Sequence, residues 1–149
     1  MTDDDSTGRG GIERSGRKRA LRLVAIQASL LSAAAHVLWA WPRLRSGDGQ
    51  RAPIFVLAAA FTLAIAVATF RGGEYRRLYA LGAGTLSTFL LGFLVWHRSA
   101  PVEAFLADPY AIVSKLAEIV GVLAFAALYR LAPPTRVALE RRREGRREG

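Results

Sequence analysis

The sequence predicts an all-α protein: a membrane-spanning up-down bundle of four transmembrane helices, with both termini cytoplasmic. Three observations lead to this prediction. The 149-residue chain contains four apolar runs that are long enough to cross a bilayer. Its charged residues, 22% of the total, gather in the two ends and in the short gaps between the runs, whereas a soluble domain spreads them along its helices and strands. Lys and Arg are also divided unequally between the two sides that the runs define.

The four apolar runs define the expected helices, because lipid offers no partner to an unpaired backbone group. Their ranges are 23–41, 53–70, 78–96 and 110–131. Pro42 is expected to end the first span, and Pro53 to begin the second. For the fourth span, Asp108 is the expected N-cap and Pro109 the first helical residue. The connections are short, so neighbouring helices are expected to pack antiparallel.

The transmembrane domain, residues 21–131, has a tail on each side. The tail over 1–20 is rich in Gly, Ser and charged residues and is predicted to be disordered. The tail over 132–149 is strongly basic, and we favour a solvated orientation signal over a short helix lying on the membrane surface. Both tails are expected to contact anionic lipid headgroups. With no folded domain to present these charges, nucleic acid is not an expected partner.

Two cues set the orientation. With both termini cytoplasmic, sixteen Lys and Arg lie on the inner side and four on the outer side. Trp39, Trp41 and Trp96 then lie at the outer interface, which amphipathic rings prefer. We therefore predict a multi-pass protein of the cell membrane. A cleaved signal peptide is the competing interpretation of the first run, but the apolar residues continue past the small residues that would form its cleavage site.

Ionisable residues inside the runs form a candidate site. Lys115 and Glu118 are three residues apart on one helix face, where they can pair. Both lie near the outer end of the span, which lowers the cost of about 2.5–3.5 kcal/mol that each would carry at the membrane centre. His36 lies at the same depth on the first span, with Ser32 one turn below it, and Thr88 on the third span could add a hydroxyl. These five residues are the predicted intramembrane polar cluster, which by default marks a functional site.

The cluster is compatible with two classes of function. If its members satisfy one another and fix the helix register, the protein is a non-enzymatic accessory or interaction subunit, which is the interpretation we prefer. If Glu118 titrates, with Lys115 and His36 beside it, the protein is a small proton- or cation-coupled carrier. A contact with a quinone headgroup is a further possible use of the same residues.

Other chemistries are not expected. The chain has no cysteine, which excludes disulfides, thiol catalysis and thiolate metal sites. A zinc site needs three or four ligands, and His36 with Glu118 supplies two. His97, the other histidine, lies at the membrane edge, so bis-histidine haem ligation is not indicated. Since nucleotide-binding glycine motifs and a Ser-His-Asp spacing are also absent from the sequence, we expect no cofactor, no metal and no enzymatic activity.

The third span carries small residues at every fourth position: Ala80, Gly84, Thr88 and Gly92. This small-xxx-small stripe allows helices to approach closely in lipid. We expect it to pack helices within a tight bundle that has no wide aqueous pore. Dimerisation with a second copy of the chain is the alternative use of the stripe.

Three segments of the sequence resemble a family of small, uncharacterised four-helix membrane proteins of halophilic archaea. They are "AAAHVLWAW" in the first span, "RRLYALGAGTL" at the start of the third, and "VSKLAEIVGVLAFAALYR" in the last; the acidic start "MTDDDS" also fits such organisms. The resemblance covers roughly residues 21–131 and implies the four-helix fold, with no assigned activity. The basic C-terminal tail departs from that family.

Overall fold

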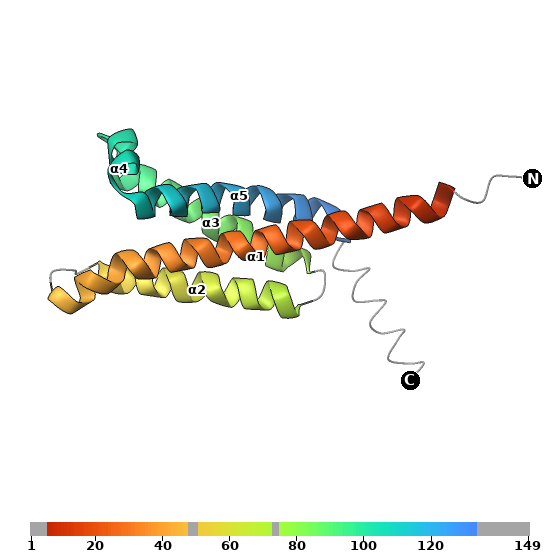
Figure 1. Ribbon diagram of the computed structural model, residues 1–149, viewed down its shortest axis with the longest axis horizontal. Coiled ribbons are helices and arrows are strands. Elements are labelled where there is room, and N and C mark those ends of the chain that lie inside the picture. Colours follow the sequence, from red (N-terminus) through yellow and green to blue (C-terminus); the bar gives the residue numbers. More distant parts are fainter. Residues whose placement is uncertain (1–5, 48–50, 73–74, 134–149) are drawn as a thin grey trace, which may run out of the picture.

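The computed structural model describes residues 6–47, 51–72 and 75–133, with side chains from residue 15 onward. These residues form five helices and no strand (Figure 1): α1 Ser6–Ser46, α2 Ala52–Arg71, α3 Arg76–Trp96, α4 Pro101–Ala107 and α5 Pro109–Leu131. The prediction of an all-α fold is therefore confirmed. Four helices are long and apolar enough to cross a membrane: α1 from Ser15 onward, α2, α3 and α5.

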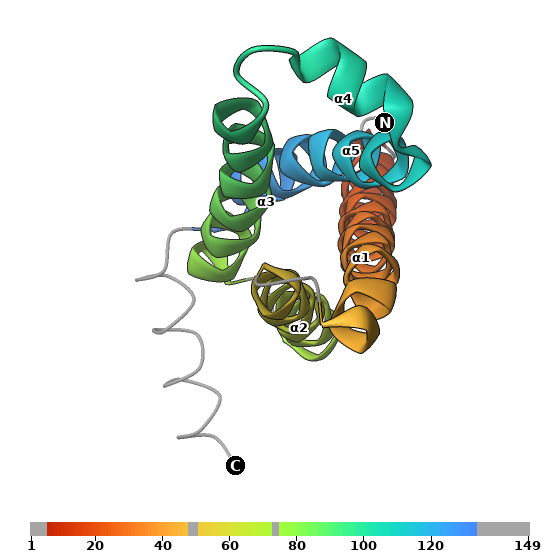
Figure 2. The same cartoon turned by 90° about the vertical axis from the view of Figure 1, so that its left-hand side faces the viewer.

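The four long helices run alternately up and down. α1 packs along both α2 and α5, α3 packs along α5, and α2 makes few contacts with α3. Figure 2 shows the bundle end-on, with these four helices around a common centre and α4 lying across one end. We call this end of the bundle the α4 end and the opposite end the Arg22 end. At the Arg22 end, α1 extends well beyond the other helices (Figure 1).

Two expectations about the first helix are wrong. Pro42 does not end it, because α1 continues to Ser46. Because proline has no backbone N–H, the carbonyl oxygen of Leu38, four residues earlier, loses its helical donor. The neighbouring Arg43 side chain donates from Nη1 to the next carbonyl oxygen, that of Trp39, at 2.7 Å. The first tail is helical from Ser6 onward and not disordered over 6–20, because extending an existing helix needs no new nucleus. Residues 1–5 and 134–149 lie outside the described residues.

The connection between α3 and α5 contains a helix that the sequence analysis did not predict. α4 is seven residues long and begins at Pro101. Immediately after it, Asp108 caps α5 as predicted: its Oδ1 accepts the Tyr110 backbone N–H at 2.9 Å.

The core lies toward the Arg22 end and joins α3 to α5. Phe125 and Leu86 are almost fully buried, and Gly82 of α3 is so close to Phe125 that an added Cβ would lie 2.7 Å from the ring. Gly121 of α5 lies similarly against the Leu86 side chain. The close helix approach therefore occurs at Gly82 and Gly121, which the small-residue stripe did not include.

The stripe predicted to pack helices does not do so within this bundle. Its four members, Ala80, Gly84, Thr88 and Gly92, are all exposed, and a Cβ added at either glycine would meet open space. The reason is the rotation of α3. The side that faces α5 carries Tyr79, Gly82 and Leu86, at spacings of three and four residues, and the stripe lies on a neighbouring side.

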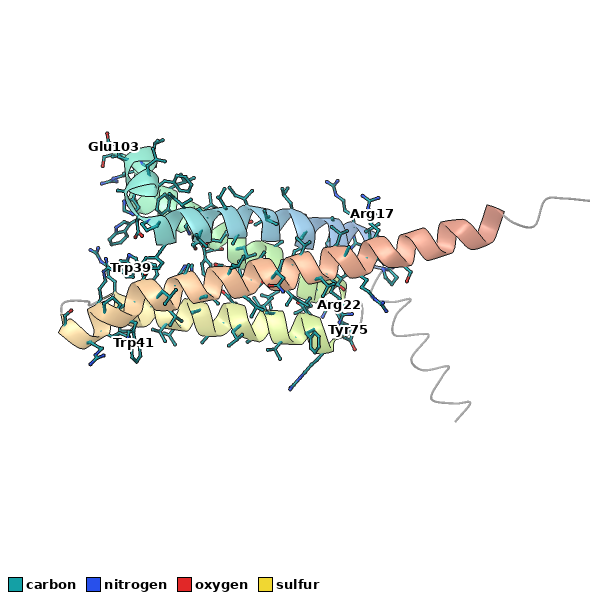
Figure 3. The ribbon with its side chains drawn as sticks, in the orientation of Figure 1. Arg17, Arg22, Trp39, Trp41, Tyr75 and Glu103 are labelled. Carbon is teal, nitrogen blue, oxygen red and sulfur yellow. The ribbon has the colours of Figure 1, made fainter. Side chains whose placement is uncertain are left out.

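The outward faces of the bundle are apolar. Among the exposed large hydrophobic residues, Leu57, Phe70 and Val95 have 70%, 71% and 74% of their surface accessible. Polar and aromatic side chains lie toward the two ends: in Figure 3, Trp39, Trp41 and Glu103 are at the α4 end, and Arg17, Arg22 and Tyr75 are toward the other. A bundle with an apolar outer surface of this extent suits a lipid environment.

Candidate functional site

Glu118 is the centre of the candidate site. Its side chain is fully buried, and both carboxylate oxygens have donors. Ser114 Oγ donates to Oε1 at 2.6 Å and Lys115 Nζ donates to Oε2 at 2.5 Å, both from the preceding turn of α5. Ser32 Oγ of α1 donates to Oε1 at 3.3 Å. The predicted Lys115–Glu118 pair is therefore formed, and it is linked to the first helix.

His36 lies beside this carboxylate. Its Nδ1 is 2.7 Å from the Ser32 carbonyl oxygen, which can only accept, so Nδ1 carries the hydrogen. Its Nε2 is 4.0 Å from Glu118 Oε1, too far for a direct hydrogen bond. The ring packs against Phe55 of α2 and Phe89 of α3, with centroids 5.4 Å and 5.1 Å away.

Lys115 connects the cluster to a third helix. Nζ also donates to the Phe89 carbonyl oxygen at 3.3 Å, and it lies 5.5 Å from the centroid of the Phe93 ring. An ammonium group has three N–H donors. The bonds to Glu118 and to the Phe89 carbonyl oxygen use two of them, so the third can bond another partner.

The burial of these charges is compensated. A buried ion pair stabilises a protein only if further hydrogen bonds satisfy its remaining atoms, because both charges lose their hydration. The Glu118 carboxylate accepts hydrogen bonds from two serine hydroxyls in addition to the ammonium group. The Lys115 ammonium group also donates to a backbone carbonyl oxygen. The pair can therefore remain charged inside the bundle.

Four of the five predicted cluster residues come together, and one does not. Thr88 Oγ1 donates to the Gly84 carbonyl oxygen of its own helix at 2.9 Å and is exposed. Sequence reasoning missed Ser114, whose position four residues before Glu118 already placed it on the same helix face. It also missed the two phenylalanines that enclose His36, for which the sequence offered no comparable signal.

A cavity of about 490 Å³ adjoins the cluster on the side of the α4 end. His36 and Lys115, both buried, are among its lining residues, whereas Glu118 does not line it. Six aromatic side chains line it: Trp39, Phe55, Phe89, Phe93, Trp96 and Tyr110. Its polar lining residues include Arg51, His97, Asp108 and Ser114. This part of the bundle is therefore less tightly packed than the sequence analysis expected.

The cavity is closed on one side and open on the other. His36 of α1 and Lys115 of α5 are buried, with 7% and 9% of their surface exposed. The lining residues of α2 and α3 include Ile54, which is 64% exposed, and Thr88 and Gly92, which are exposed as well. Exposed lining residues thus lie on α2 and α3, which contact each other less than the other neighbouring pairs of long helices, and at the α4 end, where Arg51, Trp96 and Tyr110 are exposed. The small residues of the α3 stripe leave room for the cavity.

Over 15–47, 51–72 and 75–133, no three His, Asp or Glu side chains lie close enough together to hold an ion.

Comparisons with protein-family models, with curated proteins and with solved structures found no match to the chain. The resemblance to small membrane proteins of halophilic archaea stays a prediction.

Proposed function

We propose that the protein is a non-enzymatic accessory protein of the cell membrane that binds a small lipophilic ligand in the cavity at its α4 end. One observation carries this proposal: a buried ammonium group, whose two bonds inside the bundle leave one of its three N–H donors, lines a cavity together with six aromatic side chains. Such cavities, with apolar walls and a few fixed polar groups, are the usual form of small-molecule sites, and a volume of about 490 Å³ lies within their range.

The membrane location is supported by four apolar helices whose outward faces are also apolar. For orientation, the distribution of Lys and Arg favours cytoplasmic termini. The α4 end would then face outward, with Trp41 and Trp96 exposed at the interface. The exposed side of the cavity, along α2 and α3, would admit a ligand from the outer leaflet of the bilayer.

The ligand chemistry follows from the groups that line the cavity. Flat aromatic walls favour a planar ring, which can stack against Phe55, Phe89 or Trp96. The remaining Lys115 N–H requires an acceptor, and a ring carbonyl oxygen provides one without a charge that must be desolvated. We therefore propose a quinone-type headgroup as the ligand. Glu118, which does not line the cavity, holds the ammonium group in place and does not touch the ligand.

A proton- or cation-coupled carrier is the second candidate. It is favoured by His36, which lines the cavity and has Nε2 4.0 Å from Glu118 Oε1, so it could pass a proton between cavity and carboxylate. Against it, Glu118 is enclosed by three donors and would have to leave them to exchange ions with the cavity. A pH-dependent flux into proteoliposomes that disappears in Glu118→Gln is expected only of the carrier.

Ligand binding can be tested with menadione, a small quinone that quenches tryptophan fluorescence. Trp39 and Trp96 line the cavity, so quenching of the purified protein is expected to saturate. Gly92→Leu places a side chain in the open space beside the cavity and is expected to abolish the saturable component. Gly84→Leu is the matched control: this glycine is equally open, lies on the same stripe and does not line the cavity. Equal saturable quenching in the two variants would exclude the cavity as the binding site.

A further inference from the structure

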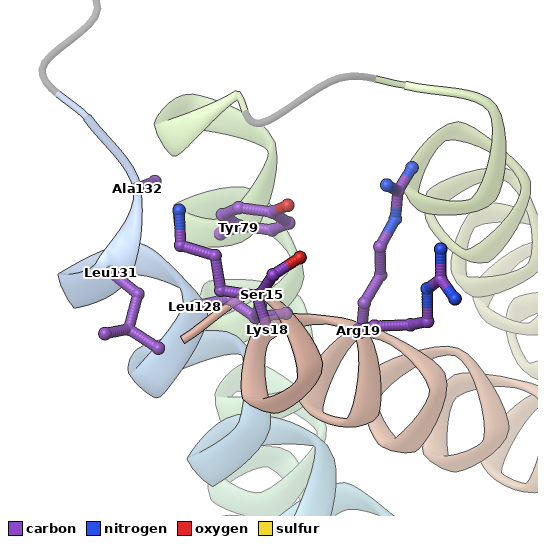
Figure 4. Close-up of a pocket in the computed structure, with 8 residues that line it drawn as sticks. Ser15, Lys18, Arg19, Tyr79, Leu128, Leu131 and Ala132 are labelled. Atoms are coloured by element: carbon purple, nitrogen blue, oxygen red, sulfur yellow. The ribbon is translucent and has the colours of Figure 1, made fainter. Parts of the chain in front are cut away.

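Cationic side chains line hollows at both ends of the bundle, but their arrangement differs. The crevice at the Arg22 end has a volume of about 170 Å³. Figure 4 shows the Lys18 side chain on the leucine side of the Tyr79 ring and away from Arg19, so these cations do not converge on one group. At the α4 end, Arg51 and Lys115 line the same cavity of about 490 Å³. This cavity therefore offers a ligand two cations, and ring binding at Lys115 leaves Arg51 unused.

Arg51 lies at the exposed margin of the cavity. It is the N-cap residue of α2 and is exposed, whereas Lys115 has 9% of its surface exposed. The Arg51 guanidinium group lies over the Trp96 ring of α3, with Cζ 3.8 Å from the ring centroid. Trp96 is itself exposed and lines the cavity. One cation of the cavity is thus inside the bundle, and the other is held against an aromatic side chain at its exposed end.

Stacking on Trp96 leaves the hydrogen-bond donors of Arg51 available. The five N–H donors of a guanidinium group lie in its own plane, so a ring beneath that plane occupies none of them. Among the described residues, the group lies over the Trp96 ring and donates no hydrogen bond. These donors can therefore bind a group of the ligand.

The charge of Arg51 is also available. The Lys115 ammonium group is balanced by the Glu118 carboxylate at 2.5 Å. Asp108 is the acidic residue that lines the cavity, and its Oδ1 caps α5 by accepting the Tyr110 backbone N–H at 2.9 Å. In the part of the chain that the structure describes, no carboxylate forms an ion pair with Arg51. An anionic group of a ligand could supply the missing counterion.

The position of Arg51 decides where a ligand can carry such a charge. A charge deep in the cavity would lose its water, which is costly, whereas a charge beside the exposed Arg51 keeps part of its hydration. Carboxylate and phosphate groups offer two or more acceptor oxygens to the in-plane donors of a guanidinium group. A neutral ring among the aromatic side chains and an acidic substituent at the margin would therefore satisfy both cations.

We propose that the cavity selects a quinone-type ring that carries an acidic substituent, and that Arg51 binds this substituent. The inference rests on the proposed function, ring binding in the cavity. It adds the chemical class of the ligand and names Arg51 as the residue that determines specificity.

Two probes with the same ring system test the proposal. Menadione carries a methyl group where 1,4-naphthoquinone-2-sulfonate carries a permanently charged sulfonate. Their dissociation constants are measured from the saturable quenching of tryptophan fluorescence in the purified full chain. Arg51→Gln is expected to weaken sulfonate binding roughly tenfold, the loss typical of a hydrogen bond to a charged group, and to leave menadione binding within about twofold of wild type. Gly92→Leu is expected to abolish the saturable component for both probes.

Arg43→Gln is the matched control. Arg43 also lies over a tryptophan that lines the cavity, with Cζ 3.8 Å from the centroid of the Trp39 ring, but Arg43 does not line the cavity. The substitution removes the same charge at the same end of the bundle and changes the surroundings of a lining tryptophan in the same way. Both probes are expected to bind this variant like wild type.

Three results would overturn the proposal and leave ring binding in the cavity intact. Equal weakening of both probes by Arg51→Gln would mean that Arg51 supports the shape of the cavity. Equal weakening of sulfonate binding by Arg51→Gln and Arg43→Gln would mean that general positive charge attracts the anion. Saturable sulfonate binding that persists in Gly92→Leu would place the anion outside the cavity. If wild type shows no saturable quenching by menadione, the proposed function itself is contradicted, and this inference with it.

Discussion

Ser32 of α1 and Glu118 of α5 are 86 residues apart in the chain, and the Ser32 hydroxyl donates to the Glu118 carboxylate at 3.3 Å. This bond ties the first long helix to the last at the depth where the buried Lys115–Glu118 pair lies. The polar cluster is therefore part of the interface between α1 and α5, and removing its charges must affect the packing of that interface.

The ion pair is expected to show strong energetic coupling. Lys115→Met leaves a buried carboxylate without its counterion, and Glu118→Gln leaves a buried ammonium group in the same condition. Each change is expected to destabilise the protein by about 3–5 kcal/mol. The double variant removes both charges and is expected to recover most of this loss. Thermal unfolding of the four proteins in one detergent measures the effect.

The opposite pattern would have a clear meaning. If both single variants and the double variant unfold at the temperature of wild type, the pair contributes nothing to stability, and its retention would have to be explained by function alone. If the double variant is less stable than either single variant, the two residues act separately and the coupling argued from their 2.5 Å contact is wrong.

Two glycines of α3 are expected to respond differently to the same substitution. At Gly82 an added Cβ would lie 2.7 Å from the fully buried Phe125 ring, so Gly82→Ala forces the two helices apart. A loss of about 1–3 kcal/mol is typical of such overpacking. At Gly84 nothing lies within 4 Å, and alanine also has the higher helix propensity, so Gly84→Ala is expected to be neutral or slightly stabilising.

Thermal unfolding of these two variants distinguishes the packing face of α3 from its small-residue stripe. A larger loss at Gly84 than at Gly82 would contradict the helix rotation that the structure has. If the loss at Gly84 depended on protein concentration, the stripe would be a contact between copies of the chain, the alternative raised by its sequence pattern.

The stripe and the polar cluster illustrate what sequence patterns can predict. Lys115, Glu118 and His36 could be placed together because each is unusual in lipid and their depths follow from counting residues from the helix ends. The stripe met the same standard of regularity, but the expectation that it packs helices within the bundle was wrong, because periodicity alone does not state which side of a helix faces its neighbours. Gly82, which does make a close contact, shares no small-residue spacing with the stripe, and only tertiary packing identifies it.

Helix ends were predictable where a local hydrogen bond determines them. At the start of α5, the Asp108 side chain accepts the backbone N–H of Tyr110, only two residues later. The sequence alone is therefore enough to predict this helix end. Pro42 was misread because the cost of a missing donor depends on its surroundings, and α1 continues to Ser46 despite it. The cavity could not be predicted at all, since its lining comes from all five helices and depends on how they are spaced in the bundle.

Arg22 is expected to stabilise the join between α1 and α2. Arg22→Met removes the donors to the carbonyl oxygens of Thr69, Phe70 and Gly72 and leaves the end of α2 uncapped. Hydrogen bonds from a charged group contribute about 1.5–3 kcal/mol, so a loss of this size is expected in thermal unfolding without added anionic lipid. Arg17→Met, at an exposed position five residues earlier, is the control and is expected to change stability by less than about 0.5 kcal/mol. Equal effects of the two variants would mean that the Arg22 bonds contribute nothing.

The orientation in the membrane can be tested directly, because the chain has no cysteine and any introduced thiol is the only one. Ser99→Cys places a thiol at an exposed position between α3 and α4, and Ser15→Cys places one at an exposed position at the Arg22 end. A membrane-impermeant maleimide is expected to label Ser99→Cys in intact cells and Ser15→Cys only after permeabilisation, because the Lys and Arg excess favours cytoplasmic termini. Ala124→Cys, at a buried position, is expected to remain unlabelled in both conditions until the protein is denatured.

The reverse order of labelling would invert the orientation and place the cavity on the cytoplasmic side. If intact cells protected both exposed thiols until permeabilisation, and the protein then fractionated without membranes, four apolar helices would not be spanning a bilayer and the proposed ligand site would lose its premise.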